Sequence, residues 1–130
     1  MTDYTALDRS PLLRYVFYPR LDFTPCPEGA ADLSVPVDEE TSVSCRLYEG
    51  HPTWPWILLF HGNGEVVSDY DGIAPFYRQR RRNLAVAGYR GYGMSGGEPT
   101  LSALARDARA ILKAVREALS QRGWKGIQCI

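Results

Sequence analysis

Hydrophobic and polar positions divide the chain into strand-like runs of two kinds. Residues 31–37 and 42–48 predict two strands joined by a polar turn at 38–41, which is typical of a hairpin. Residues 57–60 (Ile-Leu-Leu-Phe) and 84–87 (Leu-Ala-Val-Ala) are instead apolar without a break. Such runs are typical of strands that are buried on both faces of a parallel sheet. The pattern therefore predicts a hairpin followed by two buried, parallel strands.

The spacing of apolar residues predicts helices after these strands. One helix is expected over residues 66–82, where Gly72 and Pro75 favour its division into two. The clearest helix is expected over 101–119, whose apolar residues recur at three- and four-residue steps. A last apolar run at 127–130 begins another strand. The resulting order of hairpin, strand, helix, strand, helix and strand indicates an α/β fold with a mostly parallel sheet.

The first 29 residues differ from the rest of the chain. They contain four prolines, at positions 11, 19, 25 and 27, so long regular structure is not expected there. Residues 12–18 are apolar enough to pack as a short helix or an extended segment. We therefore divide the chain into a proline-rich N-terminal arm, residues 1–29, and one α/β domain, residues 30–130. This length suits a single domain of roughly 100–200 residues.

Composition narrows the classes of partner and compartment. The 15 basic and 15 acidic side chains cancel, so the net charge gives no reason to expect nucleic acid as a partner. Arg78 and Arg80–Arg82 resemble a nucleic-acid patch but are better explained as the solvated C-terminal end of a helix. The scattered cysteines Cys26, Cys45 and Cys129 lack metal-ligand spacing and favour a reducing compartment. Without a signal peptide or an apolar run of about 18 residues, we expect a cytoplasmic protein with no membrane span.

Two glycine-containing motifs follow the two buried strands. Residues 60–65 read Phe-His-Gly-Asn-Gly-Glu, and residues 89–99 read Tyr-Arg-Gly-Tyr-Gly-Met-Ser-Gly-Gly-Glu-Pro. Separated by one helix and one strand, these motifs together resemble the serine-hydrolase branch of the α/β-hydrolase superfamily. The resemblance is to bacterial and Bem46-type hydrolases with an R-G-Y-G-x-S loop, and it covers about residues 54–130. It departs at Gly88, where the family usually has an acidic residue.

The resemblance implies an esterase- or peptidase-like hydrolase that acts on a small-molecule ester or amide. The reaction would pass through a covalent seryl intermediate, with no metal or organic cofactor. Asn63 would donate its backbone N–H to the oxyanion hole, and His61, Gly62 and Gly64 would form the supporting turn. Fixed donors of this kind stabilise the negative oxygen of the tetrahedral intermediate. The alternative is that residues 62–64 form only a tight turn from strand to helix.

Neither histidine is expected to act as a general base. The resemblance makes His61 structural, and His51 lies in a Gly-His-Pro sequence typical of a solvated turn. In this superfamily the nucleophile, the acid and the catalytic histidine follow in that order, and the resemblance places all three beyond residue 130. We therefore expect the N-terminal half of an α/β-hydrolase core, truncated before the nucleophile elbow and inactive as a fragment.

The second motif also matches two other patterns. Gly93–Gly97 satisfies G-x-S-x-G, but Glu98–Thr100 separate Ser95 from the helix, whereas a nucleophile elbow joins strand and helix directly. Gly91–Gly96 satisfies the G-x-G-x-x-G of dinucleotide-binding folds, but the acidic residue about 20 positions on, Glu117, lies inside the long helix. A non-enzymatic α/β binding domain stays an alternative, and a small nucleotide-binding domain that uses Gly91–Gly96 is a weaker one.

The resemblance also orders the strands. The strand at 54–60 should lie between the strand at 84–87 and the strand that starts near residue 127. That last strand would then expose a free edge. A free apolar edge is a template for pairing with another chain, so we expect self-association through the sheet edge.

Overall fold

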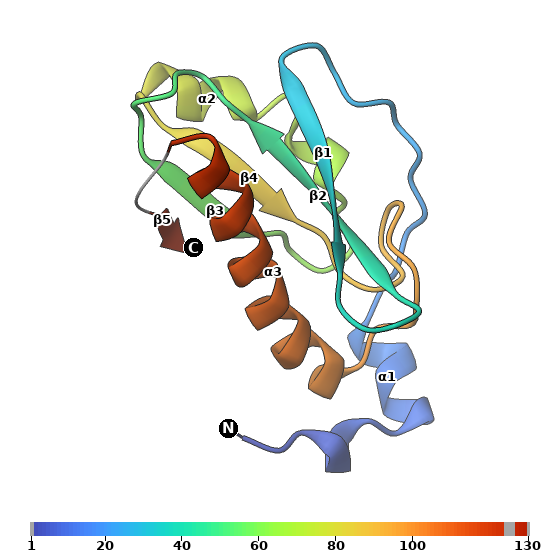
Figure 1. The fold of residues 1–130 in the computed structure, drawn as a ribbon. Helices are drawn as coiled ribbons and strands as arrows, with labels where there is room; N and C mark the ends of the chain where they lie inside the picture. Colours follow the sequence, from blue (N-terminus) through green and yellow to red (C-terminus); the bar gives the residue numbers. More distant parts are fainter. Residues whose placement is uncertain (1, 124–126, 130) are drawn as a thin grey trace.

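A computed structural model describes residues 2–123 and 127–129. It contains five strands: β1 (Ala30–Pro36), β2 (Ser42–Tyr48), β3 (Trp56–Phe60), β4 (Asn83–Ala87) and β5 (Ile127–Cys129). They form one sheet in the order β1-β2-β4-β3-β5 (Figure 1). β1 is antiparallel to β2 and β2 to β4, whereas β3 is parallel to both β4 and β5. The predicted place of β3 between β4 and β5 is confirmed; residue 130 lies outside the described residues.

The predicted hairpin is confirmed as β1 and β2. Its register runs from Ala30 opposite Tyr48 to Pro36 opposite Ser42. The carboxylate of Asp38 closes the turn, because it accepts hydrogen bonds from the backbone N–H groups of Glu40 and Thr41 at 3.0 and 2.7 Å. An aspartate at this position favours a turn for that reason.

The helical segments are η1 (Thr5–Leu7), α1 (Ser10–Val16), η2 (Val67–Tyr70), α2 (Ala74–Gln79) and α3 (Leu101–Gln121). The helix expected over 66–82 is divided in two, as its sequence favoured. Pro75 has no backbone N–H to continue a helix and lies in the first turn of α2. The long helix is confirmed as α3, with the Thr100 side chain capping its start and Gly123 in the left-handed region (φ 82°) after its end.

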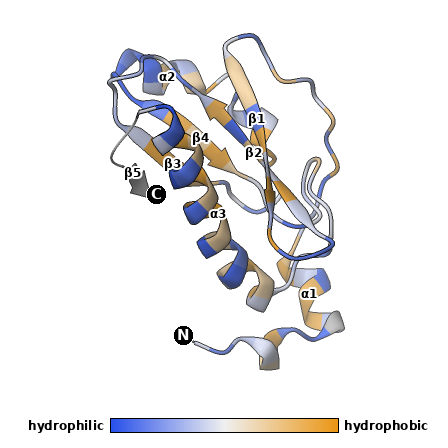
Figure 2. Ribbon diagram, in the orientation of Figure 1, coloured by the Kyte–Doolittle hydropathy of each residue, from blue (hydrophilic) through white to orange (hydrophobic). Residues whose placement is uncertain are grey.

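The core has two layers, one on each face of the sheet. α3 covers one face, where Trp56 and Leu58 of β3 pack in the same cluster as Ile111, Val115 and Leu119. η2 and α2 cover the other face, where Ile57 and Leu59 pack with Val67, Ala74, Leu84 and Val86. Because successive side chains of β3 point to opposite faces, both sets must be apolar, which explains the unbroken run. In Figure 2 the central strands carry the hydrophobic colour, whereas hydrophilic colour recurs along α3.

A buried arginine joins the hairpin to the N-terminal arm and to the segment after η2. Arg46 of β2 is fully buried. Its guanidinium pairs with the carboxylates of Asp32 (2.7 Å) and Asp71 (3.1 Å) and donates to the carbonyl of Thr24 at 3.0 Å. The Tyr48 hydroxyl also donates to Asp71, at 2.6 Å. The hydrogen bonds to Asp32, opposed in part by burial, raise the pKa of Arg46, so this group stays charged.

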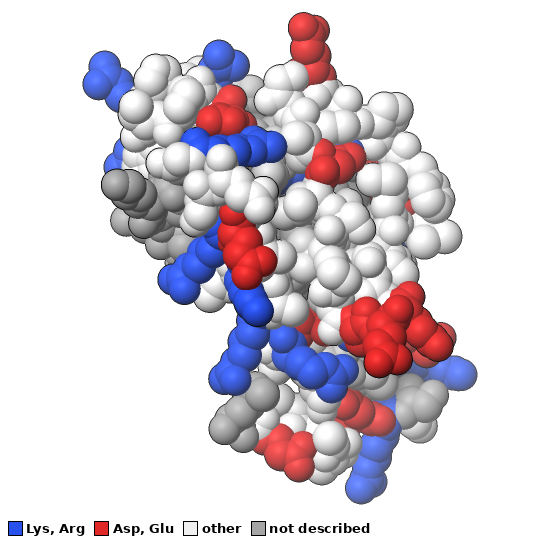
Figure 3. Space-filling model, viewed as in Figure 1, with Lys and Arg blue, Asp and Glu red and all other residues white. Residues whose placement is uncertain are grey.

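Basic side chains lie on the exposed side of α3 and at the C-terminal end of α2. The exposed side chains of α3 include Arg106, Arg109, Lys113 and Arg116, and Figure 3 shows basic side chains along this helix. At the end of α2, the guanidinium of Arg80 donates to the carbonyl of Phe76 at 3.1 Å, as expected for cations at a helix C-terminus. Of the helices in the described residues, none combines the length and apolarity that a bilayer crossing needs.

Candidate active site

The chain reverses sharply after β3, over residues 61–65. The Gly62 N–H donates to the carboxylate of Glu65 at 2.7 Å, and the Glu65 N–H donates back to the Gly62 carbonyl at 3.1 Å. Gly64 has φ 82°, in the left-handed region that favours glycine. The Tyr70 hydroxyl holds the Glu65 carboxylate from a distance of 2.8 Å. The turn is therefore fixed at both ends, at the carboxyl end of a buried parallel strand.

Asn63 lies at the tip of this turn and is exposed. Its backbone N–H makes no hydrogen bond to any of the described residues. Its side chain, by contrast, is fully engaged: Nδ2 donates to the Val16 carbonyl at 2.6 Å, and Oδ1 accepts from the Tyr92 hydroxyl at 2.5 Å. The backbone N–H of this exposed residue is therefore left without an internal acceptor among the described residues.

His61 begins the same turn but is buried, with 2% of its surface exposed. Its ring packs against Tyr89 and Tyr92, with ring centroids 4.4 and 5.6 Å away. Nδ1 lies 2.9 Å from the Gly62 carbonyl, so the ring carries its proton there, and Nε2 is buried without a partner among the described residues. Burial lowers the pKa of His61, which keeps the imidazole neutral. This environment fits the structural role that the resemblance implied.

Two residues that could have suggested nucleophile and base chemistry have other partners. Ser95 is buried, and its Oγ accepts a hydrogen bond from the Ser44 backbone N–H at 2.9 Å. His51 is exposed in its loop and contacts Thr53, whose Oγ1 lies 2.9 Å from Nδ1. The described residues hold no hydrogen bond between either histidine and Ser95. Ser95 therefore ties the loop after β4 to the hairpin.

Most N–H groups of the glycine loop at residues 91–96 donate hydrogen bonds to carbonyl groups of the loop itself, the N-terminal arm or the hairpin. Gly91 donates to the Gly96 carbonyl at 3.0 Å, Gly93 to the Arg20 carbonyl at 2.7 Å, and Gly96 to the Ser42 carbonyl at 3.1 Å. A loop that cradles phosphate needs such N–H groups to point outward and free. The observed loop therefore does not favour the nucleotide-binding alternative.

The N-terminus of α3, which follows this loop, is also occupied. The carboxylate of Asp8 accepts from the backbone N–H groups of Leu101 (2.8 Å) and Ser102 (3.3 Å). The Thr100 hydroxyl oxygen accepts from the Ala103 N–H at 3.0 Å. A carboxylate of the chain itself therefore stands where a phosphate would bind.

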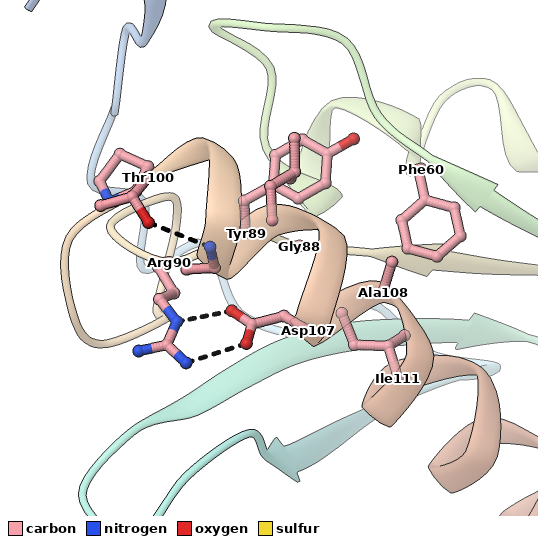
Figure 4. Close-up of a pocket in the computed structure, with 11 residues that line it drawn as sticks. Phe60, Gly88, Tyr89, Arg90, Thr100, Asp107, Ala108 and Ile111 are labelled. Carbon is pink, nitrogen blue, oxygen red and sulfur yellow. Dashed lines mark hydrogen bonds and ion pairs between the residues drawn. The ribbon is translucent and has the colours of Figure 1, made fainter. Parts of the chain in front are cut away.

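Arg90 anchors the loop after β4 to α3. Figure 4 shows its guanidinium facing the carboxylate of Asp107. Both residues line a pocket to which Phe60, Tyr89 and Ile111 also contribute. On the same side of the sheet, a cavity of about 440 Å³ opens beside Phe60, Tyr89 and α3, and its other lining residues are Tyr4, Leu101, Leu104, Ala105 and Ala108. The Tyr89 hydroxyl donates to the His61 carbonyl at 2.6 Å, and burial raises its pKa to about 12. The loop and the turn are thereby linked.

The comparisons with known proteins concern the fold. No family model matches the chain, and no curated protein matches it. Among solved structures, the esterase Pf2001 of Pyrococcus furiosus superposes with a TM-score of 0.69 at 16% identity, over 87% of this chain and 47% of that one. EstE1, a carboxylesterase cloned from a metagenomic library, superposes with a TM-score of 0.62 at 23% identity, over 98% of this chain and 44% of its own.

The chain has an α/β-hydrolase-like fold. A predicted CIB-like hydrolase of Thermoplasma acidophilum is a further match, with 25% identity and a TM-score of 0.53, over 66% of this chain and 45% of that one. The chain thus spans a little under half the length of each of these three proteins. This fold was expected from the two motifs and the order of the strands.

Two parts of the site were not predicted from the sequence. One is the hydroxyl of Tyr92, which lies in the second motif but reaches the Asn63 side chain of the first. The other is the backbone of Val16 and Tyr18, which binds the same side chain from the N-terminal arm. The R-G-Y-G motif marks Tyr92 as a loop residue, but nothing in its spacing points to residue 63.

Proposed function

We propose that residues 30–130 are the N-terminal half of a serine-hydrolase domain that hydrolyses small-molecule esters or amides. In this proposal Asn63 provides one donor of the oxyanion hole. The observation that carries the proposal is the free backbone N–H of Asn63, placed by a rigid turn at the carboxyl end of a buried parallel strand. The esterases among the structural matches support the reaction class.

The chemistry follows from what this turn offers. When a nucleophile attacks an acyl carbonyl, negative charge develops on the oxygen, and a fixed N–H stabilises it without reorganisation. The second donor would come from the residue after the nucleophile. Loss of one donor typically costs about 2.7–4 kcal/mol of transition-state stabilisation. Because burial lowers the pKa of His61 and its ring packs against two tyrosines, His61 supports the turn and takes no part in proton transfer.

The first experiment uses the 130-residue chain alone. We expect no hydrolysis of p-nitrophenyl acetate or butyrate and no labelling by a fluorophosphonate, because Ser95 is buried and bound to the hairpin backbone. A known serine esterase is the positive control for the substrates and the label. Labelling that disappears in Ser95→Ala would contradict the proposal.

The second experiment supplies the rest of a hydrolase core. Residues 1–130 are fused to the part of EstE1 that follows the matched region, and ester turnover is measured. Asn63→Pro removes the N–H in question, and we expect kcat to fall by about 10²–10³. Gly72→Ala is the control, since a Cβ there meets nothing within 4 Å. Equal turnover in the two variants, both shown to be folded by circular dichroism, would refute the role of Asn63.

We also propose that the chain associates through the β5 edge, as its resemblance to a half-core led us to expect. In the described residues β5 pairs only with β3, and the apolar cavity beside α3 lies on one side of the same sheet. Sedimentation velocity should show oligomers that increase with concentration. A monodisperse monomer with a cooperative thermal transition would favour the alternative, an independent α/β binding domain.

A cytoplasmic location is part of the proposal. It is supported by the free thiols of Cys26 and Cys45 in the described residues, because thiols stay reduced in the cytoplasm. Fractionation of cells that express the tagged chain tests it, and recovery in a secreted fraction would count against it.

A further inference from the structure

The side chain of Asn63 joins two segments that are 45 residues apart. Its Nδ2 donates to the Val16 carbonyl at 2.6 Å, while its Oδ1 accepts from the Tyr18 N–H at 3.1 Å. One donor and one acceptor of the amide thus pair with the backbone of the N-terminal arm, as a neighbouring strand would. We call these contacts the arm clamp.

Tyr92 completes the arm clamp from the loop after β4. Its hydroxyl donates to Asn63 Oδ1 at 2.5 Å and accepts from the Tyr18 N–H at 2.9 Å. The ring is buried and packs against His61 of the turn. Tyr92 therefore contacts the turn and the arm through its hydroxyl, and His61 through its ring.

Further contacts hold the arm in the same place. The Arg20 guanidinium pairs with the carboxylate of Asp69, which follows the turn. The Arg20 carbonyl accepts from the Gly93 N–H at 2.7 Å, and the Asp22 carboxylate accepts from the Ser68 hydroxyl at 2.5 Å. Residues 16–22 thus lie between the turn after β3 and the loop after β4, and they touch both.

We propose that the N-terminal arm positions the oxyanion donor through the Asn63 side chain. The polar atoms of that side chain are held from two directions, so the plane of the adjoining peptide, and with it the direction of the Asn63 N–H, is set by the arm and by Tyr92. Asn63 is thus a donor by its backbone, and Tyr92 and Tyr18 are positioning residues. This inference rests on the proposed function for the use of the N–H, although the coupling itself is a property of the 130-residue chain.

The experiment follows backbone amides by nuclear magnetic resonance in the 130-residue chain. Asn63→Ala removes the side-chain contacts of Asn63 and leaves the Tyr18–Tyr92 hydrogen bond, whereas Tyr92→Phe removes only the Tyr92 hydroxyl. Tyr77→Phe is the matched control, because the Tyr77 hydroxyl makes no hydrogen bond to the described residues. We expect the Tyr18 N–H to exchange about tenfold faster in both clamp variants. The signals of residues 62–64 should shift, while amides of β4 keep their exchange rates. Unchanged signals at 62–64 in both variants would overturn the proposal.

A conservative variant adds a readout that a general loss of packing would not give. In Asn63→Asp at pH 7, a carboxylate faces the Val16 carbonyl and cannot donate to it. As the pH is lowered towards about 3.5, the carboxyl group becomes protonated and can donate again. We expect the Tyr18 and Gly64 signals to move back towards their wild-type positions. A displacement that is independent of pH would refute the clamp.

The two proposals fail separately in these experiments. If the fused enzyme shows no dependence on Asn63 but the amide signals respond as described, the arm positions the turn and the oxyanion role is wrong. If the amide signals do not respond, the arm has no part in setting the turn, whatever the fused enzyme does.

Discussion

The guanidinium of Arg90 and the carboxylate of Asp107 form a two-point ion pair between the loop after β4 and α3. Nε lies 2.5 Å from Oδ2 and Nη2 lies 2.9 Å from Oδ1. Both side chains are almost completely buried, 11% and 6% exposed. Arg90 also reaches the half-exposed carboxylate of Asp38 in the hairpin turn, at 2.7 Å. One arginine therefore connects the loop after β4, α3 and the hairpin turn.

Asp107→Ala should destabilise the chain strongly. The substitution leaves a buried guanidinium without its main partner, and breaking such a pair typically costs about 3–5 kcal/mol. Urea denaturation followed by circular dichroism measures the change in the free energy of unfolding. Asp38→Asn is the matched control, because its carboxylate is more exposed to solvent, and its effect should be much smaller. An equal decrease in the free energy of unfolding in the two variants would show that the buried ion pair contributes no more to stability than the exposed one.

Gly88→Ala should also destabilise the chain, for a steric reason. A Cβ at residue 88 would lie 2.5 Å from the backbone oxygen of Ser44, which already accepts the Gly88 N–H at 3.0 Å. Overpacking against a backbone atom costs roughly 1–3 kcal/mol. In Gly72→Ala the new Cβ meets nothing within 4 Å, so that variant should be neutral or slightly stabilised. Thermal unfolding of both proteins decides the matter, and similar midpoints would contradict the predicted clash.

His61 should make stability depend on pH just below neutrality. Burial lowers its pKa in the folded chain, so between that lowered value and about 6.5 the unfolded chain binds more protons. Stability is then complete above about pH 6.5 and decreases as the pH falls towards the lowered pKa. In His61→Gln this contribution is absent. Urea titrations from pH 8 to pH 5 measure the difference between the two proteins, and parallel curves would rule out a buried neutral imidazole.

Cys26 and Cys45 should differ in reactivity towards iodoacetamide. Burial raises the pKa of the Cys45 thiol to about 12, and the thiolate is the reactive form. Cys26 is exposed. We expect modification of Cys26 in the native chain and modification of Cys45 only in urea. Mass spectrometry of tryptic peptides locates the label, with Cys26→Ser as the control. Rapid native labelling of Cys45 would mean that the hairpin does not pack as described.

Most of the fold could be predicted because its pattern is local. The unbroken apolar run of β3 and the periodic apolar residues of α3 each reflect the neighbours of a single element. The pairings across the molecule could not be predicted in this way. Arg46 lies in a strand yet is fully buried, and although Asp32 is its partner across the hairpin, nothing in the sequence indicates that Asp71 will meet it as well. Contacts between groups far apart in sequence leave no period along the chain.

In the candidate site, too, a local feature could be predicted from the sequence and the long-range contacts could not. Asn63 was expected from the family resemblance of a local motif, a buried strand followed by Gly-Asn-Gly. The hydroxyl of Tyr92 and the backbone of Val16 are partners that only the folded chain brings to that residue. The donor could therefore be predicted, whereas the groups that orient it could not.

The attachment of the N-terminal arm has a consequence for biosynthesis. Asp8 has its partners at residues 101 and 102, and Tyr18 and Arg20 have some of theirs at residues 92 and 93. A ribosome that adds about 5–20 residues per second needs on the order of ten seconds to make the intervening chain. During that interval the arm lacks these contacts, so it is more open to proteases and chaperones than in the folded chain. Complete ordering of the arm therefore has to wait until the loop after β4 and the start of α3 have been made and folded.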